Sequence, residues 1–198
     1  MYNMLQGVGY VRVIAGTLRG RRIEMADNLA IRPTSDKARG AVFSSLGELI
    51  PESCFLDVFA GTGAMGIEAV SRGARTVVAV ERSPRAAALI VRNRDSLGID
   101  PLVLRVRIGT YTKVLPELLG QEFDVVFADP PYGDLAGAHV LELIDRYDLL
   151  AARGALIIEH FAKESLPAEI GKLRLLKVKN YGQTVMSHYM RAGGSKRA

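Results

Sequence analysis

The feature that most constrains this chain is an alternation of apolar, strand-like runs with helix-like segments from Cys54 to His160. The apolar runs are CFLDVFA, TVVAVE, LVLRVRI, FDVVFAD and GALIIEH, and helices are expected near residues 63–72, 84–97, 111–119, 136–149 and 163–170. Strands that are apolar on both faces and alternate with helices form parallel sheets that are covered on both sides. The sequence therefore predicts an α/β fold.

Both ends of the chain depart from this alternation. The segment KLRLLKVKNYGQTVMSHYMR, residues 172–191, contains two strand-like runs joined around NYGQ, which predicts a β-hairpin. Five strands followed by this hairpin predict a seven-stranded sheet with one antiparallel member. Near the start, residues 11–25 (VRVIAGTLRGRRIEM) predict a small extended arm, and a helix is expected within residues 32–50.

The positive charge is concentrated near the start of the chain. The 198 residues carry a net charge of +5. Residues 1–40 hold seven Lys/Arg against three Asp/Glu, whereas the rest of the chain holds 19 against 18. This asymmetry predicts a basic arm that projects from a near-neutral body and faces a polyanion. A solvated surface segment would have the same composition.

Several classes of protein do not fit the composition. The chain is 48% hydrophobic, which is ample for a core, and its single cysteine, Cys54, cannot form an internal disulfide. We find no secretory signal pattern and no apolar run of 18 residues, so we expect a cytoplasmic protein without membrane contact. His139, His160 and His188 lack metal-ligand spacing, so no metal is expected.

A glycine-rich motif lies between the first of these strands and the helix that follows it. Gly61-Thr62-Gly63-Ala64-Met65-Gly66 fits the pattern G-x-G-x-x-G, and Glu81 ends the next strand twenty positions after Gly61. Glycines let the backbone approach a ligand closely, and a carboxylate at the second strand tip accepts bonds from ribose hydroxyls. The pair predicts an adenosine-type cofactor. A nicotinamide dinucleotide and S-adenosylmethionine (SAM) both suit it.

Asp57 favours SAM. It lies in the strand just before the glycine motif, where its carboxylate would repel the pyrophosphate of a dinucleotide. SAM instead carries an ammonium group in its amino-acid moiety, which Asp57 can attract directly or through water.

The fourth strand stops abruptly at Asp129-Pro130-Pro131-Tyr132. Proline fixes φ and lacks an N–H, so two prolines end the strand. Ligands of open α/β sheets lie beyond the carboxyl ends of the strands, so this tip should face the glycine motif. We interpret residues 129–132 as an amine clamp. Asp129 and the Pro130 carbonyl, held by the two prolines, accept from the exocyclic NH₂ of a base, and Tyr132 provides a stacking face.

Together, the motifs RVIAGTLRGRRI, RPTSDKAR, LDVFAGTGAMGIEAVSRGA, ADPPY and YGQTVMSHY resemble the RsmD-type bacterial 16S rRNA guanine-N2 methyltransferases. The resemblance covers about Val11 to Arg191, and its most specific part is the front end LRGRR…RPT. It implies a class I SAM-dependent methyltransferase fold, Rossmann-like, with a seven-stranded, mostly parallel sheet and helices on both faces. SAM is the implied cofactor. The implied partner is 16S rRNA, in a small ribosomal subunit or an assembly intermediate, and the enzyme is expected to be a monomer.

The resemblance also implies an organisation and individual roles. A basic arm and lead-in helix would occupy residues 1–50, the catalytic domain residues 51–192, and a tail residues 193–198. Related enzymes carry Asp or Asn after the third strand to bond the adenine amine. Here backbone groups or the hydroxyl at Gly109-Thr110 are expected to substitute. By motif match the cofactor is bound by Asp57, Gly61, Thr62, Gly63 and Glu81, and guanine is held by Asp129, Pro130, Pro131 and Tyr132. The side chains predicted to meet RNA are Arg19, Arg21, Arg22, Arg32 and Arg39.

Three rival functions explain part of the pattern. A DNA or other RNA amino-methyltransferase, acting on adenine N6 or cytosine N4, would use the same clamp. A DNA enzyme, however, normally adds a target-recognition domain, for which a forty-residue arm leaves little room. A nicotinamide-dependent oxidoreductase leaves the clamp unexplained, and a non-catalytic RNA-binding module explains neither the clamp nor the glycine motif. The resemblance implies methyl transfer from SAM to guanine N2 of 16S rRNA, and an amino-methyltransferase that acts on DNA or on another RNA is the alternative.

Overall fold

The computed structural model describes residues 9–25, 36–131, 136–181 and 184–192. The predicted tail, Arg32 and Tyr132 lie outside these ranges. The elements, in chain order, are β1 (Tyr10–Arg12), β2 (Arg22–Glu24), α1 (Asp36–Leu46), the 3-10 helix η1 (Gly47–Leu49), β3 (Cys54–Asp57), α2 (Ala64–Ser71), β4 (Thr76–Glu81), α3 (Pro84–Ser96), β5 (Leu104–Ile108), α4 (Tyr111–Glu117), β6 (Phe123–Ala128), α5 (Ala136–Arg146), β7 (Leu150–Phe161), β8 (Glu169–Ile170), β9 (Leu173–Tyr181) and β10 (Thr184–Arg191).

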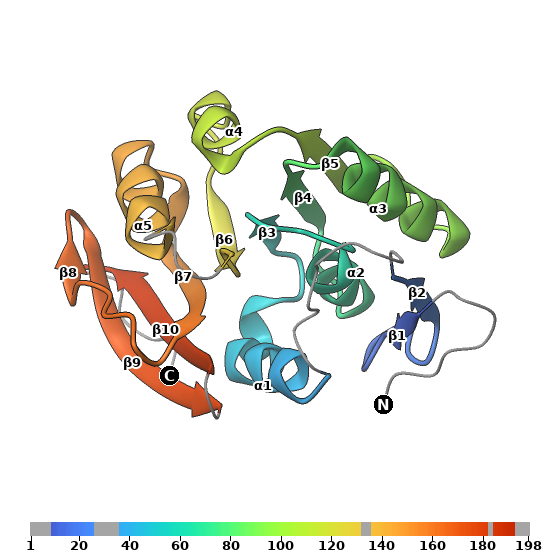
Figure 1. The fold of residues 1–198 in the computed structure, drawn as a ribbon, viewed down its shortest axis with the longest axis horizontal. Helices are drawn as coiled ribbons and strands as arrows, with labels where there is room; N and C mark the ends of the chain where they lie inside the picture. Colours follow the sequence, from blue (N-terminus) through green and yellow to red (C-terminus); the bar gives the residue numbers. More distant parts are fainter. Residues whose placement is uncertain (1–8, 26–35, 132–135, 182–183, 193–198) are drawn as a thin grey trace.

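One mostly parallel sheet organises the molecule, with strand order β5-β4-β3-β6-β7-β10-β9-β8 (Figure 1). Strands β3 to β7 pair in parallel, and β10 is antiparallel to both of its neighbours, β7 and β9. The prediction of a parallel sheet that ends in a hairpin is confirmed. The sheet has eight strands because the two-residue strand β8 adds to the free edge of β9.

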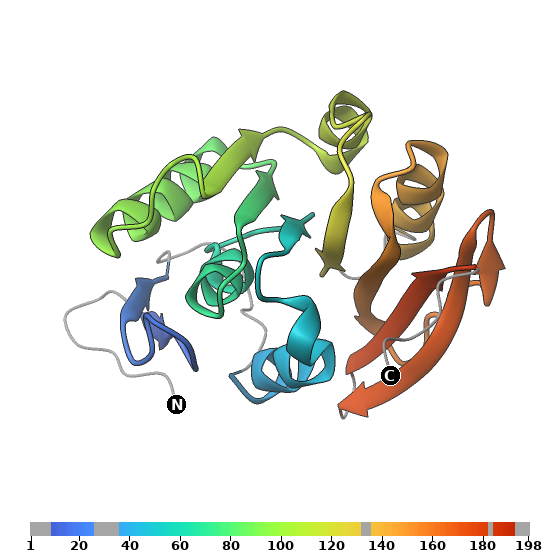
Figure 2. The same cartoon turned by 180° about the vertical axis from the view of Figure 1, so that it is seen from behind.

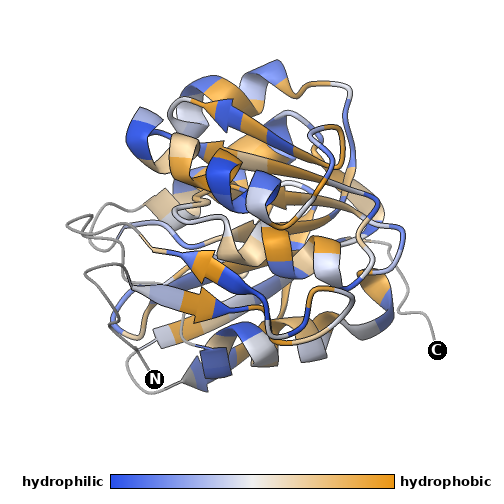
Figure 3. Cartoon of the chain, turned by 90° about the vertical axis from the view of Figure 1, so that its right-hand side faces the viewer, coloured by the Kyte–Doolittle hydropathy of each residue, from blue (hydrophilic) through white to orange (hydrophobic). Residues whose placement is uncertain are grey.

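Helices cover both faces of the sheet (Figures 1 and 2). On one face, α1, α2 and the β1–β2 arm pack in a cluster that includes Phe43, Phe55 and Ile67. On the other face, α4 and α5 pack in a cluster that includes Leu115 and Ile144. Figure 3 shows the same layering, with hydrophobic strands between helices whose outer sides are largely hydrophilic. Among the described residues, no helix is long and apolar enough to cross a bilayer.

The helix predicted at 163–170 is wrong. The chain turns after β7 and then forms β8. Pro167 disfavours helical backbone at the preceding residue, and its carbonyl accepts a hydrogen bond of 2.8 Å from the Tyr189 hydroxyl of β10. This stretch is therefore fixed as an irregular segment under α5.

The basic arm is docked, so the prediction that it projects from the body is wrong. Val11 and Ile23, which face each other across the β1–β2 hairpin, are buried in the core cluster of α1 and α2. The turn between β1 and β2 is tied to the last residue of α2, because Thr17 N–H donates to the Ser71 carbonyl (2.7 Å) and Leu18 N–H to the Ser71 hydroxyl (2.9 Å).

A buried carboxylate completes this docking. Glu68 of α2 is fully buried and accepts from the N–H groups of Ile14 (2.7 Å) and Ala15 (3.1 Å) in the arm. It also pairs with Arg72 at 2.6 Å and lies 3.8 Å from Arg39 Nε. A buried carboxylate needs such partners to offset its desolvation.

Arg39 is a correction to the predicted RNA-facing set. Its side chain is 0% exposed, and one Nη donates to the carbonyl of Arg12 and to Asp36. The guanidinium is buried because it lies where α1, the arm and α2 meet, within reach of Asp36, the Arg12 carbonyl and Glu68. Arg39 is a structural link in this fold and not a surface for phosphate.

Gly16 provides the close approach on which the docked arm depends. A Cβ at Gly16 would lie 1.7 Å from the Ser71 carbonyl oxygen, whereas a Cβ at Gly20 would meet nothing within 4 Å. Both residues have positive φ, +83° and +82°. The two glycines therefore have nearly the same φ, and they differ in how much room there is for a Cβ atom.

We predict that Gly20→Ala costs about 1 kcal/mol, from the left-handed conformation alone. Gly16→Ala should cost at least about 3 kcal/mol, because backbone must move as well. Urea unfolding measures both. Hydrogen exchange at the Ile14 and Ala15 amides should accelerate only in the Gly16 variant. Equal losses in the two variants would contradict the docked arm.

Candidate active site

The carboxyl ends of β3 to β7 meet at one edge of the sheet. The register pairs Asp57 with Phe127 and Glu81 with Ile108. Just beyond the ladder, Val58 N–H donates to the Phe127 carbonyl at 2.9 Å. This bond holds the start of the β3–α2 loop beside the end of β6. The glycine motif therefore begins beside the strand end that leads into Asp129, as the sequence predicted.

The glycine motif forms a tight loop from β3 into α2. Gly61 and Gly63 have φ of 54° and 80°. Gly63 is the N-cap of α2, and a Cβ there would lie 2.9 Å from Ile90 of α3. Thr62 is buried, and its carbonyl accepts from the Asn93 side chain at 3.1 Å. The lack of a side chain at Gly63 thus lets the loop pack closely against α3.

Glu81, at the tip of β4, supports this loop directly. One carboxylate oxygen accepts from Gly61 N–H at 2.9 Å, and the other accepts from Ser83 N–H at 2.8 Å. A carboxylate oxygen accepts two hydrogen bonds. Glu81 can therefore hold the loop and still accept from two further donors, such as the hydroxyls of a ribose.

Asp57 is the electrostatically most unusual group at this edge. Its side chain is 1% exposed, and neither carboxylate oxygen makes a hydrogen bond of good geometry with a described residue. Burial and then the nearby Glu81 carboxylate raise the pKa of Asp57 to about 7, and the backbone N–H groups of Gly66 and Phe59, which lie close by, offset part of this rise. A buried acid that is so weakly hydrogen-bonded, next to a second acid, favours a cationic ligand.

Gly109-Thr110 lies beside Glu81. Gly109 N–H donates to the Glu81 carbonyl at 2.9 Å, and the Thr110 hydroxyl shares a hydrogen bond of 2.9 Å with Thr112. Next to this pair, the apolar side chain of Ile108 is 60% exposed. Sequence reasoning missed Ile108, because an isoleucine at the end of a strand normally indicates a core position.

The described part of the amine clamp lies at the end of β6. Asp129 is half-buried, Pro130 is buried and Pro131 is exposed. Tyr132 lies outside the described residues, so its place in the clamp stays a sequence prediction. The strand order of the sheet reverses between β3 and β6, and ligands of open α/β sheets bind beside such a switch point. The backbone at Asp129-Pro130 leaves the sheet at this position.

Glu159 is a second acid that sequence reasoning missed. Ala128 of β6 pairs with Ile158 of β7, so Asp129 and Glu159 are the next residues on adjacent parallel strands. Glu159 is only 4% exposed. The signal for it is the parallel register, which the sequence does not encode in any local motif. Among the described residues, no group of acids, histidines and cysteine forms a potential metal site.

The remaining predicted RNA contacts lie away from this edge. Arg19, Arg21 and Arg22 are exposed on the arm. Arg21 donates to the carbonyl of Ser96 at 3.2 Å, at the end of α3 that is opposite to Ser83 and Glu81. The structure therefore separates a carboxylate-lined edge from a basic surface on the arm.

A family model described as conserved hypothetical protein 95 matches residues 11–190. The chain belongs to this family, the RsmD family of methyltransferases. YlbH of Bacillus subtilis is 31% identical over 185 residues, which cover 92% of this chain and 100% of YlbH. Ribosomal RNA small subunit methyltransferase D of Escherichia coli K12 is 29% identical over 93% of this chain and 92% of its own length. The solved structure of yhhF from Escherichia coli covers 92% of this chain with a TM-score of 0.81 and 28% identity.

The cofactor of this RsmD-family protein is SAM, and the residues at the edge of the sheet fit it. The buried, weakly hydrogen-bonded Asp57 carboxylate suits the ammonium of the cofactor, and Glu81 has acceptor capacity for ribose hydroxyls. A pyrophosphate would bring two negative charges toward Asp57 and Glu81, which the electrostatics oppose. When bound, SAM supplies an electrophilic methyl group on a sulfonium.

Asp57 also generates a prediction about pH. Folding raises the pKa of Asp57 from 3.8 to about 7. Between about pH 4 and pH 7, Asp57 therefore carries a proton in the folded protein but not in the unfolded chain. Stability of the cofactor-free protein should therefore fall with rising pH across this window, by roughly 4 kcal/mol at most. Asp57→Asn should be more stable than the wild type at pH 8 but not at pH 4, as measured by urea unfolding.

The same variant should bind S-adenosylhomocysteine (SAH) more weakly at pH 8, which calorimetry measures. Glu142→Gln, on the outer surface of α5, is the matched control and should change neither property. An Asp57→Asn variant with the wild-type pH dependence would show that Asp57 is not the titrating group.

Proposed function

We propose that this protein transfers the methyl group of SAM to the exocyclic N2 amine of a guanine in 16S rRNA. The observation that carries the proposal is the position of the amine clamp, beside the glycine motif at the switch point of the sheet. There, a planar base held at Asp129-Pro130 lies next to a cofactor held at Gly61 and Glu81. Ile108 offers apolar surface to the adenine, and Gly109-Thr110 offers polar groups.

The chemistry requires acceptors more than a strong base. The lone pair of a guanine N2 amine is delocalised into the ring, so the amine is a weak nucleophile. Asp129 and the Pro130 carbonyl accept from its two hydrogens and orient the lone pair toward the methyl group. SAM held by Asp57, Gly61 and Glu81 would supply the methyl group, and the proton that N2 gives up on methylation would pass to Asp129 or to water. Positioning of this kind can supply most of the acceleration.

Glu159 supports guanine over other bases. Guanine presents N1–H next to its N2 amine, so its edge offers adjacent donors. Adenine N1 is an acceptor, and a carboxylate beside Asp129 would repel it. Glu159 follows Ile158 in register with Asp129 and is nearly buried. Two carboxylates on adjacent strands therefore match the donor pattern of guanine.

The rRNA part of the proposal rests on the arm and on the relatives. The arm presents Arg19, Arg21 and Arg22 at its surface, and exposed arginines suit phosphates. The Escherichia coli relative is named as a small-subunit rRNA methyltransferase. A ribosomal subunit or an assembly intermediate is the proposed form of the substrate, with the protein acting as a monomer in the cytoplasm.

Incubation with tritiated SAM and separate pools of rRNA, tRNA and DNA tests the proposed substrate class. Ribosomal RNA and small subunits from a strain that lacks the gene should accept label, whereas the tRNA and DNA pools should not. Labelling of DNA alone would favour the rival amino-methyltransferase. Absence of label in every pool, together with SAH binding, would overturn the proposal.

Asp129→Ala tests the clamp. Loss of a positioned acceptor at a transition state commonly costs ~10²–10³ in rate, so kcat should fall by about that factor. The affinity for SAH should stay close to that of the wild type, because Asp129 holds the base and not the cofactor. Tyr132→Phe should be mild and Tyr132→Ala severe if the ring acts by stacking. A fully active Asp129→Ala enzyme would contradict the clamp.

A further inference from the structure

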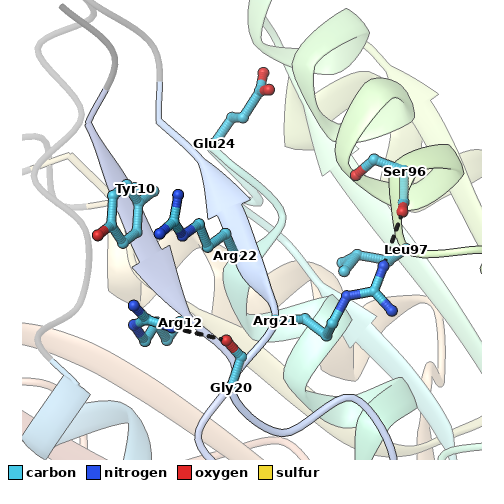
Figure 4. A pocket seen from close by; sticks show the side chains of 8 residues that line it. All are labelled: Tyr10, Arg12, Gly20, Arg21, Arg22, Glu24, Ser96 and Leu97. Atoms are coloured by element: carbon cyan, nitrogen blue, oxygen red, sulfur yellow. Dashed lines mark hydrogen bonds between the residues drawn. The ribbon is translucent and has the colours of Figure 1, made fainter. Parts of the chain in front are cut away.

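The arm and the end of α3 enclose a pocket that the methyl-transfer site does not use. The pocket has a volume of about 500 Å³ and is lined by residues of β1, β2 and the last turn of α3. Figure 4 shows Tyr10, Arg12 and Arg22 on the hairpin and Arg21 reaching toward Ser96. Its volume falls within the range typical of small-molecule sites.

The outer face of the hairpin concentrates positive charge at this pocket. Arg12 and Arg22 are directly opposite each other on β1 and β2, and the buried residues Val11 and Ile23 form the other face. Like charges directly opposite on antiparallel strands are destabilising. Within the described residues, no ion pair neutralises Arg12, Arg21 or Arg22. An anion placed between these guanidinium groups would relieve the repulsion.

An aromatic ring lies within the same cluster. The guanidinium carbons of Arg22 and Arg12 lie 4.5 Å and 5.5 Å from the ring centroid of Tyr10. The single acid of the lining, Glu24, is opposite Tyr10 in the hairpin. The pocket thus combines cations for a phosphate, flat groups for stacking and a carboxylate that accepts from the N–H groups of a base.

The pocket is distinct from the methyl-transfer edge. It contacts the C-terminal end of α3, whereas the N-terminal end of α3 follows Glu81. With 13 residues, α3 is about 20 Å long. A nucleotide in the pocket therefore cannot be the one whose amine lies in the clamp.

We propose that this pocket binds a second, unpaired nucleotide of the RNA substrate, with its phosphate between Arg12 and Arg22 and its base against Tyr10 and Glu24. This inference rests on the proposed function only in taking RNA as the substrate. The site would fix the register of the RNA on the protein, so that one guanine reaches the clamp. Arginines alone would suit any polyanion, and the aromatic ring and Glu24 favour a nucleotide.

Photocrosslinking tests the site without any need for turnover. A 16S rRNA fragment that contains 4-thiouridine should crosslink to Tyr10, identified by mass spectrometry of the tryptic peptide that ends at Arg12. Asp129→Ala should crosslink equally well, because the clamp is elsewhere. Failure of methyl transfer would therefore leave this test intact, and failure of the crosslink would overturn the pocket while leaving the proposed function standing.

Kinetics on small subunits provide the second readout. Arg12→Ala/Arg22→Ala should raise KM for RNA by about tenfold or more and reduce the salt slope of binding by about 0.7 per lost contact. Tyr10→Ala should raise KM in the same way, and Tyr10→Phe should not. The affinity for SAH should be unchanged in all of them, which also reports on folding.

Two controls complete the test. Arg105→Ala removes an exposed arginine of β5 that does not line the pocket, so it should leave KM, the salt slope and the crosslink unchanged. Binding of free GMP and ATP is measured as well, because it distinguishes a pocket that contacts RNA from a site for soluble nucleotides. Pocket variants with a wild-type KM for RNA would overturn the inference. So would tight binding of free GMP or ATP in the pocket without competition from the rRNA fragment.

Discussion

The repulsion between two carboxylates at the tips of β3 and β4 is the interaction on which the site depends. Burial raises the pKa of Asp57, whose carboxylate makes no hydrogen bond of good geometry with a described residue, and the Glu81 carboxylate raises this pKa further. The two carboxylates are close together because the parallel strand order brings both tips to the same edge of the sheet. The N–H groups of Gly61 and Ser83 stabilise the Glu81 carboxylate at this edge. The cofactor-free protein thus gives up stability to prepare a site for a cation, a common relation between stability and function.

A second buried carboxylate, Glu68, determines where the basic surface of the arm lies. Because Glu68 binds the backbone of Ile14 and Ala15, the arm is fixed on α2, the helix that starts at the glycine motif. Asn93 of α3 extends this connection, since its side chain accepts from Glu24 N–H and donates to the Thr62 carbonyl. The basic hairpin and the glycine motif are therefore parts of one hydrogen-bonded arrangement, through which, in the proposed function, a contact on the arm would position RNA at the clamp.

The sequence predicted the features that are encoded locally. Strand-helix alternation predicted the parallel sheet, and the glycine motif predicted the loop between β3 and α2. The hydrogen bond by which Glu81 supports Gly61 was not predicted. Features that depend on contacts between distant segments were not predictable in this way. Arg39 reads as a surface arginine until α1 packs against Glu68, and Gly16 reads as a turn residue until the Ser71 carbonyl is seen beside it. Glu159 gains its place beside Asp129 only from the register of β6 and β7.

The central claim is that adjacent acceptors at the ends of β6 and β7 select the N2 amine of guanine. Nucleoside analysis tests it most directly. Small subunits from a strain that lacks the gene are methylated with the purified protein, digested to nucleosides and examined by mass spectrometry against standards. The account predicts one new modified nucleoside, N2-methylguanosine, in the 16S rRNA. N6-methyladenosine or N4-methylcytidine as the product would contradict it.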